Sequence, residues 1–258
     1  MKFRDIGFLV GLTIAAVIVH GYHPNAEDAA IYLPGVEKQI WPELFPFNQQ
    51  FFASHARFSI FPQLIAWSVK ITHLSLYQAL FLWHLLSIVL LLWACFRLAA
   101  LCTQNVSGRW AAVSLVAALL TLPVAGTALY IMDQYLNPRN LAAFASVFAV
   151  TRIFEKKYFR ALLWIAFAAC VHPLMWVFPF SFGALWLVIE QIEHRTGWRV
   201  EGAAALGSLL SIGIPLVPSN SAAYHESARM HAYFYIQDWQ WYEWVGIVAP
   251  LALLWWFA

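Results

Sequence analysis

The chain has 258 residues, of which 62% are hydrophobic and 11% are charged, and its formal net charge at pH 7 is +2. A soluble domain carries about 25% charged residues, so this composition excludes an ordinary soluble protein and predicts an integral membrane protein. The net charge is too small to indicate nucleic acid as a partner.

Apolar stretches of about 17 to 25 residues recur between short charged connections, and this length suits helices that cross a hydrocarbon core of about 30 Å. Helices are expected because backbone groups in lipid must bond within their own segment. The predicted spans are 6–22, 77–101, 109–132, 140–154, 158–171, 173–192, 202–217 and the stretch from residue 244 onward.

Two of these spans, 140–154 and 158–171, are short and predict a hairpin that neighbours shield or that does not cross the full bilayer. The last span stops about 15 residues after it begins, so either the chain is a fragment or its last helix is unusually short. We therefore expect an all-α polytopic membrane helix bundle of about eight spans. It would form a single transmembrane domain over residues 1–258 that lacks a C-terminal portion.

The distribution of Lys and Arg predicts a cytoplasmic N-terminus. Lys2 and Arg4 precede the first span, which lacks a small-residue cleavage site after it and is expected to be an uncleaved anchor. With this orientation, ten of the 15 Lys and Arg residues lie in inside segments, as the positive-inside rule requires. The long loop 23–76 is then outside.

This first outside loop contains apolar residues near helical spacing over 61–71, with Gln63 and Lys70 interrupting the pattern. A full membrane span is one alternative, but it would move every later cation to the other side. The pattern favours helices that lie in the membrane surface, with aromatic anchors at headgroup depth. We expect a partly ordered lid against the outer leaflet.

An acidic pair, Glu27 and Asp28, follows the first span directly. One interpretation is structural: Asn25 is the N-cap of a helix, and Asp28 completes a capping box and favours the helix dipole. The other is functional. Because neighbouring residues on a helix point about 100° apart, one carboxylate would act directly and the other would support it.

A second outside feature is the turn "MDQYLNPRN", residues 132–140. Asn137 is the expected N-cap of the next helix, with Pro138 at its first position. Arg139 then lies at a helix N-terminus, where it opposes the dipole but, with free backbone N–H groups, suits a phosphate. The alternatives are that Arg139 binds lipid headgroups or pairs with Asp133.

Three further features have simple structural explanations. His172 precedes Pro173 between two spans, and capping explains it. The outside loop 220–244 is rich in Tyr, Trp and His, which indicates an aromatic belt or a surface that stacks on sugars or grips a lipid chain. His84, inside a span, is expected to make a hydrogen bond between helices and not to be a ligand.

The arrangement of these parts resembles the GT-C superfamily of membrane glycosyltransferases. It is most similar to the branch of protein O-mannosyltransferases and lipid A aminoarabinose transferases, in which an acidic pair follows the first span, often with a nearby Tyr, as in "EDAAIY" with Tyr32. That branch has a Pro-containing surface helix before the second span, matched by "FPQLIAWSVKITHL". It usually has a Pro-Pro pair, whereas this chain has Pro62 alone, with His55 and Arg57 upstream.

The resemblance implies transfer of a sugar from a polyprenyl-phosphate carrier to an acceptor on the outer face, usually with inversion. Asp28 or Glu27 would be the general base or would hold a divalent metal ion. Arg139 would bind the carrier phosphate and stabilise its charge. The resemblance implies further substrate contacts at Asp133, His172, Tyr32, His55, Arg57, Tyr224 and His225.

The same resemblance implies a bacterial inner (plasma) membrane location, with the lipid-linked donor and membrane lipid as partners and no nucleic acid. A non-catalytic scaffold or an inactive relative is the alternative. A lipid or solute transporter is less favoured because its ionisable groups are expected near the bilayer midplane, in two related halves.

Overall fold

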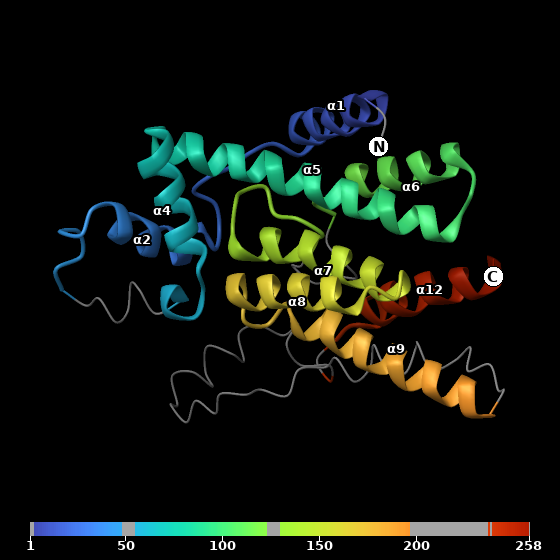
Figure 1. The fold of residues 1–258 in the computed structure, drawn as a ribbon. Coiled ribbons are helices and arrows are strands. Elements are labelled where there is room, and N and C mark those ends of the chain that lie inside the picture. The colour runs from blue at the N-terminus through green and yellow to red at the C-terminus, as the bar shows by residue number, and fades with distance from the viewer. Residues whose placement is uncertain (1–2, 48–54, 123–129, 197–236, 238, 258) are drawn as a thin grey trace. The chain divides into compact units, whose positions relative to one another are not determined.

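The structure is a computed structural model that describes residues 3–47, 55–122, 130–196, 237 and 239–257 (Figure 1). These residues form nine α-helices and one 3₁₀ turn, and they include no strand. The elements are α1 (Phe3–His20), α2 (Ala29–Ile40), η1 (His55–Phe58), α4 (Phe61–Thr72), α5 (Leu76–Cys102), α6 (Val106–Ala118), α7 (Pro138–Phe154), α8 (Tyr158–Val171), α9 (Val177–Thr196) and α12 (Trp241–Phe257). The predicted all-α class is confirmed for this part of the chain.

By their contacts the residues divide into two compact units. One comprises Met1–Leu120 with Met132–Ser211 and contains α1 to α9. The other comprises Thr121–Ile131 with Ile212–Ala258 and contains α12. The predicted span 202–217 lies outside the described residues.

Two described helices, α1 and α5, are long and apolar enough to cross a membrane. The 27 residues of α5 extend about 40 Å at 1.5 Å per residue, which exceeds a hydrocarbon core of about 30 Å. A complete capping box begins α5: Gln78 N–H donates to Ser75 Oγ (3.3 Å), and Ser75 N–H donates to Gln78 Oε1 (3.0 Å). The other apolar stretches of the first unit are shorter, namely Val106–Ala118 in α6, Tyr158–Val171 in α8 and Val177–Ile192 within α9.

Several helix boundaries agree with the sequence. The predicted span 158–171 coincides with α8, and 77–101 differs from α5 by one residue at each end. The first helix ends two residues before the prediction because Gly21 adopts a left-handed conformation (φ 81°) and its N–H bonds to Val17 O (2.9 Å).

Two boundaries were predicted wrongly. The helix expected over 109–132 ends at Ala118, and Met132 is outside it, with its N–H bonded to Leu120 O (3.0 Å) across the returning chain. The helix expected from residue 173 begins at Val177 because residues 173–176 form turns. Apolar composition continues through both turns, so hydropathy alone does not mark them.

Helix α7 is the central helix of the first unit and packs between α5 and α8 (Figure 1). Its Phe148 ring stacks on Trp164 of α8 (4.8 Å between centroids) and meets Trp93 of α5 edge-on (5.3 Å). Small side chains let the neighbouring helices approach closely. The buried residues that do so are Ala142, Ala145 and Ala149.

The described part of the first loop forms α2, η1 and α4. Gly35 lets α2 approach its neighbours, since a Cβ atom there would lie 2.8 Å from Ala56 Cβ. The segment before α4 is attached to the end of α8 by Ser59 Oγ–H, which donates to Val171 O (2.5 Å), and by Ile60 N–H, which donates to Cys170 O (2.9 Å). The loop is therefore fixed to the helical core at one end.

Candidate functional site

The acidic pair and the turn before α7 are brought together although they are more than 100 residues apart. His23 N–H donates to Gln134 O (2.8 Å), and Asp28 N–H donates to the Tyr135 hydroxyl (3.2 Å). Tyr135 lies within the quoted turn, but nothing in its local pattern marked it as a partner of Asp28. The sequence analysis missed this residue.

Asp28 occupies the N-cap position of α2, yet its side chain makes no capping hydrogen bond. Asn25 is not a cap either, and its Oδ1 accepts a hydrogen bond from the Tyr77 hydroxyl (3.4 Å). The predicted capping box of Asn25 and Asp28 is therefore wrong. Both Glu27 and Asp28 are exposed, and capping does not account for their carboxylates.

The backbone at Glu27 is strained. Its φ of 46° lies in the left-handed region, which costs a non-glycine residue about 1–2 kcal/mol. Backbone strain of this kind concentrates at active sites and ligand clamps, where the surrounding structure maintains it. Glu27 is thus held in an unfavourable conformation beside a second free carboxylate.

Arg139 pairs with Asp133, one of the alternatives that the sequence left open. Its Nη2 lies 2.5 Å from Asp133 Oδ1 and its Nε lies 3.1 Å from Oδ2, which is a bidentate ion pair. The Asp133 side chain is 1% exposed and that of Arg139 is 23% exposed. Two donors of the guanidinium are thus engaged internally, and the rest of the side chain reaches the surface.

The turn that carries this pair is ordered by asparagines. Asn137 is the N-cap of α7, as predicted, and its Oδ1 accepts the Asn140 N–H (3.0 Å). Its Nδ2 donates to Asp133 Oδ2 (2.6 Å), and Asn140 Nδ2 donates to Tyr135 O (2.8 Å). These bonds fix the position of Asp133, which in turn orients Arg139.

The ionisable groups of this region act on one another. Burial raises the pKa of Tyr32; the Asp28 carboxylate raises it further, the Arg139 guanidinium lowers it and the Asp133 carboxylate raises it. Burial also raises the pKa of Tyr135, with Asp133 and Asp28 adding to the increase. Both phenols therefore stay protonated at neutral pH and can serve as hydrogen-bond donors.

For Arg139 itself, burial works against the charged form. The hydrogen bonds and charge of Asp133 outweigh this effect, and Tyr135 and Asp28 add to them, so the pKa of Arg139 is raised overall. The Asp28 carboxylate thus favours the charged guanidinium, although the two side chains do not form an ion pair. The resulting group of Asp28, Tyr32, Asp133, Tyr135 and Arg139 is called the acidic–arginine cluster below.

Other predicted residues lie outside this cluster. His172 ends α8, and its Nδ1 accepts the Leu174 N–H (3.3 Å), which supports the capping interpretation. His55 and Arg57 belong to η1, and the structure does not describe their side chains. Tyr224 and His225 lie outside the described residues.

The hydrogen bond between helices that was predicted for His84 is not made by its Nδ1 atom. The residue is 2% exposed, and its Nδ1 is buried with no hydrogen-bond partner among the residues that the structure describes. The Tyr22 ring lies beside it, with 5.1 Å between centroids. Aromatic packing therefore holds the His84 ring on this side.

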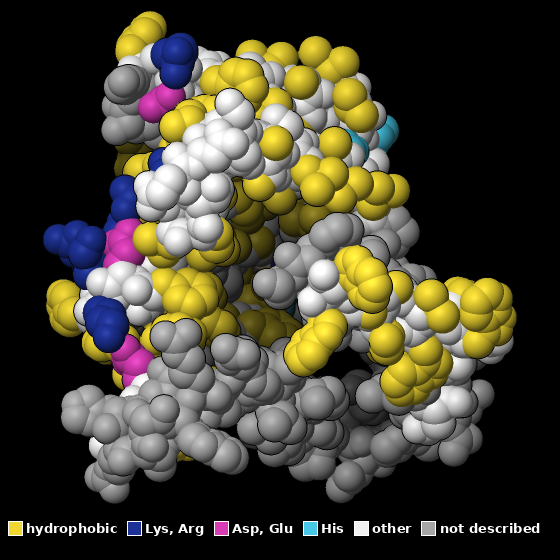
Figure 2. All heavy atoms as spheres, turned by 90° about the vertical axis from the view of Figure 1, so that its right-hand side faces the viewer, with side chains coloured by type: hydrophobic (Ala, Val, Ile, Leu, Met, Phe, Trp, Pro, Cys, Tyr) yellow, Lys and Arg dark blue, Asp and Glu magenta, His cyan; other side chains and the backbone are white. Residues whose placement is uncertain are grey.

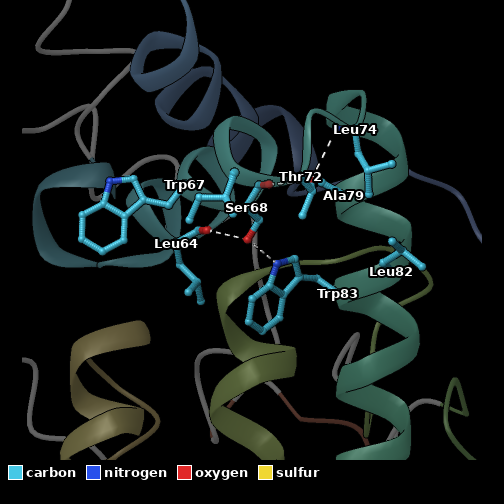
Figure 3. A pocket seen from close by; sticks show the side chains of 9 residues that line it. Leu64, Trp67, Ser68, Thr72, Leu74, Ala79, Leu82 and Trp83 are labelled. Atoms are coloured by element: carbon cyan, nitrogen blue, oxygen red, sulfur yellow. Dashed lines mark hydrogen bonds between the residues drawn. The ribbon is translucent and has the colours of Figure 1, made fainter.

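An apolar groove lies between α4 and α5 and has a volume of about 370 Å³ (Figure 3). Its polar atoms are engaged with one another: Trp83 Nε1–H donates to Ser68 Oγ (2.8 Å), and Ser68 Oγ–H donates to Leu64 O (2.8 Å). The remaining walls are mainly hydrophobic, with Trp67, Ile71, Leu74 and Leu82 among the lining residues. The groove suits a hydrocarbon chain and offers little to a polar ligand.

The described residues contain no group of three or more His, Cys, Asp and Glu side chains that could hold a metal ion. The donors present are the two adjacent carboxylates of Glu27 and Asp28. A magnesium ion is commonly held by one or two carboxylates together with substrate phosphate oxygens, so this donor set fits that ion.

Comparisons of the chain with protein-family models, with curated proteins and with solved structures found no match. The site is therefore interpreted from its own chemistry. It combines exposed carboxylates, an oriented guanidinium and protonated phenols, in the same unit as the apolar groove.

Proposed function

We propose that this protein is a multi-pass membrane glycosyltransferase that moves a sugar from a polyprenyl-phosphate carrier to an acceptor hydroxyl on the outer face of the membrane. The observation that carries the proposal is the acidic–arginine cluster, in which the Asp28 N–H donates to the Tyr135 hydroxyl (3.2 Å) of the turn that carries the oriented Arg139, while the Asp28 carboxylate is uncapped. A base and an anion-binding cation within one polar site are what transfer from a phosphate leaving group needs.

In the proposed reaction, Asp28 accepts the proton of the acceptor hydroxyl as its oxygen attacks the anomeric carbon. The bond between that carbon and the phosphate oxygen breaks, and its electron pair leaves with the carrier phosphate. Arg139, oriented by Asp133, stabilises the charge that develops on the phosphate. Glu27 supports Asp28. In the alternative, the acidic pair would hold a divalent ion, which would neutralise phosphate charge.

The carrier needs a surface for its isoprenoid chain, and the groove between α4 and α5 supports this part of the proposal. It is apolar, and α5 is one of the two helices long enough to cross a membrane. In the proposed topology the N-terminus is cytoplasmic, the chain crosses a bacterial inner membrane about eight times, and the loop 23–76 covers the outer end. The cation distribution of the sequence supports this orientation.

The test is donor turnover by the purified protein in lipid nanodiscs. A panel of polyprenyl-phosphate sugars would be supplied with a membrane extract as the acceptor source, and released polyprenyl phosphate would be measured. We expect Asp28→Asn to reduce release by at least about a hundredfold, the usual contribution of a general base. Glu27→Gln is the matched control and should lose less; full turnover by Asp28→Asn would refute the assignment.

A second candidate, a non-catalytic membrane scaffold, is favoured by the bidentate pair itself. A guanidinium already neutralised by a carboxylate that is 1% exposed serves the fold without any ligand. This candidate predicts that no lipid-linked sugar is consumed and that Asp28→Asn changes neither stability nor any binding of polyprenyl phosphate. Protection of the protein by polyprenyl phosphate against thermal unfolding would count against it.

A further inference from the structure

At the opposite end of α7 from the acidic–arginine cluster, cationic side chains gather around two carboxylates. Glu155 accepts from Arg97 Nη2 (2.5 Å), Arg152 Nη1 (2.5 Å) and Lys157 Nζ (2.8 Å). Lys156 Nζ lies 2.5 Å from Glu190 Oε1, and the Tyr158 hydroxyl donates to Glu190 Oε2 (2.7 Å). Figure 2 looks at the side of the molecule where α5 and α7 end, and Lys and Arg side chains lie beside Asp and Glu side chains along its left edge.

The positive charge of this group exceeds its negative charge. Its cations, called the basic cluster, are Arg97, Arg152, Lys156 and Lys157, and they contact Glu155 and Glu190. The Lys156 side chain is 70% exposed and that of Lys157 is 47% exposed. An excess of two positive charges is therefore available to an anion.

An apolar groove of about 440 Å³ begins at the same place and is called the α8–α9 groove. Tyr158 lines its end, so the ion pair between Lys156 and Glu190 lies at its mouth. Ile153 of α7 and Gly183 of α9 form its floor: a Cβ atom at Gly183 would lie 2.9 Å from Ile153 Cδ1, so glycine lets the two helices approach. The rim is exposed and apolar, with Phe159 at 74% and Leu162 at 57%.

We propose that the α8–α9 groove and the basic cluster together bind an anionic phospholipid, with one acyl chain in the groove and the headgroup phosphate on Lys156. Positive charge is concentrated at one end of an apolar groove, as an amphiphile with one charged end requires. Basic pockets between helices on the cytoplasmic side recognise anionic headgroups in this way.

This inference rests on the proposed membrane location but not on sugar transfer. It assigns the site to the inner leaflet, at the other end of the helices from the proposed reaction. Lipid binding and donor turnover can therefore fail separately.

The experiment is native mass spectrometry of the full chain released from detergent micelles, with phosphatidylglycerol or phosphatidylcholine added at matched concentrations. We expect phosphatidylglycerol to be retained about tenfold more strongly, and the variant Lys156→Gln to lose this preference. Lys70→Gln is the matched charge control because Lys70 lies on α4, outside the basic cluster, and donates to Gln39 O. It should leave the preference unchanged.

The groove is tested separately with Ala184→Phe, which fills it from an exposed position on α9. The control is Ala111→Phe, an exposed position on α6. We expect Ala184→Phe to reduce retention of phosphatidylglycerol severalfold and the control to have no effect. Equal retention of both lipids by the wild type, unchanged retention in Ala184→Phe, or full competition by inorganic phosphate would each overturn the proposal.

Discussion

The ion pair between Asp133 and Arg139 allows fold and function to be separated by a double-mutant cycle. Removing one partner of a buried pair leaves an uncompensated charge, which costs about 3–5 kcal/mol. For Arg139→Gln we expect the lower end, about 3 kcal/mol, because the Asn137 amide still donates to the Asp133 carboxylate. For Asp133→Asn we expect about 2 kcal/mol, since Arg139 is 23% exposed and can turn toward water.

The double variant Asp133→Asn/Arg139→Gln contains no unpaired charge and should cost about 2 kcal/mol in total. The coupling energy between the two residues is then about 3 kcal/mol. The assay is SDS-induced unfolding of the protein in detergent micelles, followed by tryptophan fluorescence. Single changes that each cost less than about 1 kcal/mol and simply add would refute the buried-pair reasoning.

The same variants test the proposed phosphate contact. The double variant should fold nearly as well as Asp133→Asn but should not consume the lipid-linked donor, because no guanidinium remains. If it turned over the donor at the wild-type rate, Arg139 would serve the fold alone.

Three further predictions concern stability. Burial opposes the charged form of Glu155, but the hydrogen bonds and charges of its cationic neighbours hold its pKa at about 2. Glu155 therefore contributes its full stabilisation of the folded state above pH 4.5, the ordinary pKa, and loses it as the pH falls toward 2. Glu155→Gln should therefore lower the free energy of unfolding by about 2 kcal/mol near neutral pH and leave it almost unchanged near pH 2. The control is Glu190→Gln, which should cost at most about 1 kcal/mol because its Lys partner is 70% exposed. Both variants would be measured by thermal unfolding across pH. Asn137→Ala removes both the α7 cap and a bond to Asp133 and should cost about 2 kcal/mol in SDS unfolding. Ser75→Ala removes the α5 cap and should cost about 1 kcal/mol in the same assay; no change in either cap variant would contradict the capping geometry.

Local chemistry determined much of the helical architecture in advance. Periodicity and length predicted α5 and α8 within one residue, and Asn137 followed by Pro138 predicted the beginning of α7. These signals work because caps and apolar runs act through neighbouring residues. The end of α6 was missed because its turn at 119–122 is as apolar as the helix itself.

The candidate site could be predicted only in part. The sequence identified Asp28, Arg139 and Asp133 and left open whether Arg139 pairs with Asp133, but its expectation of a capping box for Asp28 was wrong. A capping hydrogen bond depends on the helix starting at the right residue, and α2 starts at Ala29, too late for Asn25 to be its cap.

By itself, then, the sequence determined the helical class, the apolar character, several helix boundaries and the residues that carry charge. The tertiary structure alone decided which polar groups meet: the Asp28 N–H with the Tyr135 hydroxyl, and the basic cluster with Glu155 and Glu190. The physical reason is the distance along the sequence over which each interaction acts. Helix formation depends on residues within a few positions of one another, whereas the pairing of side chains depends on how whole helices pack.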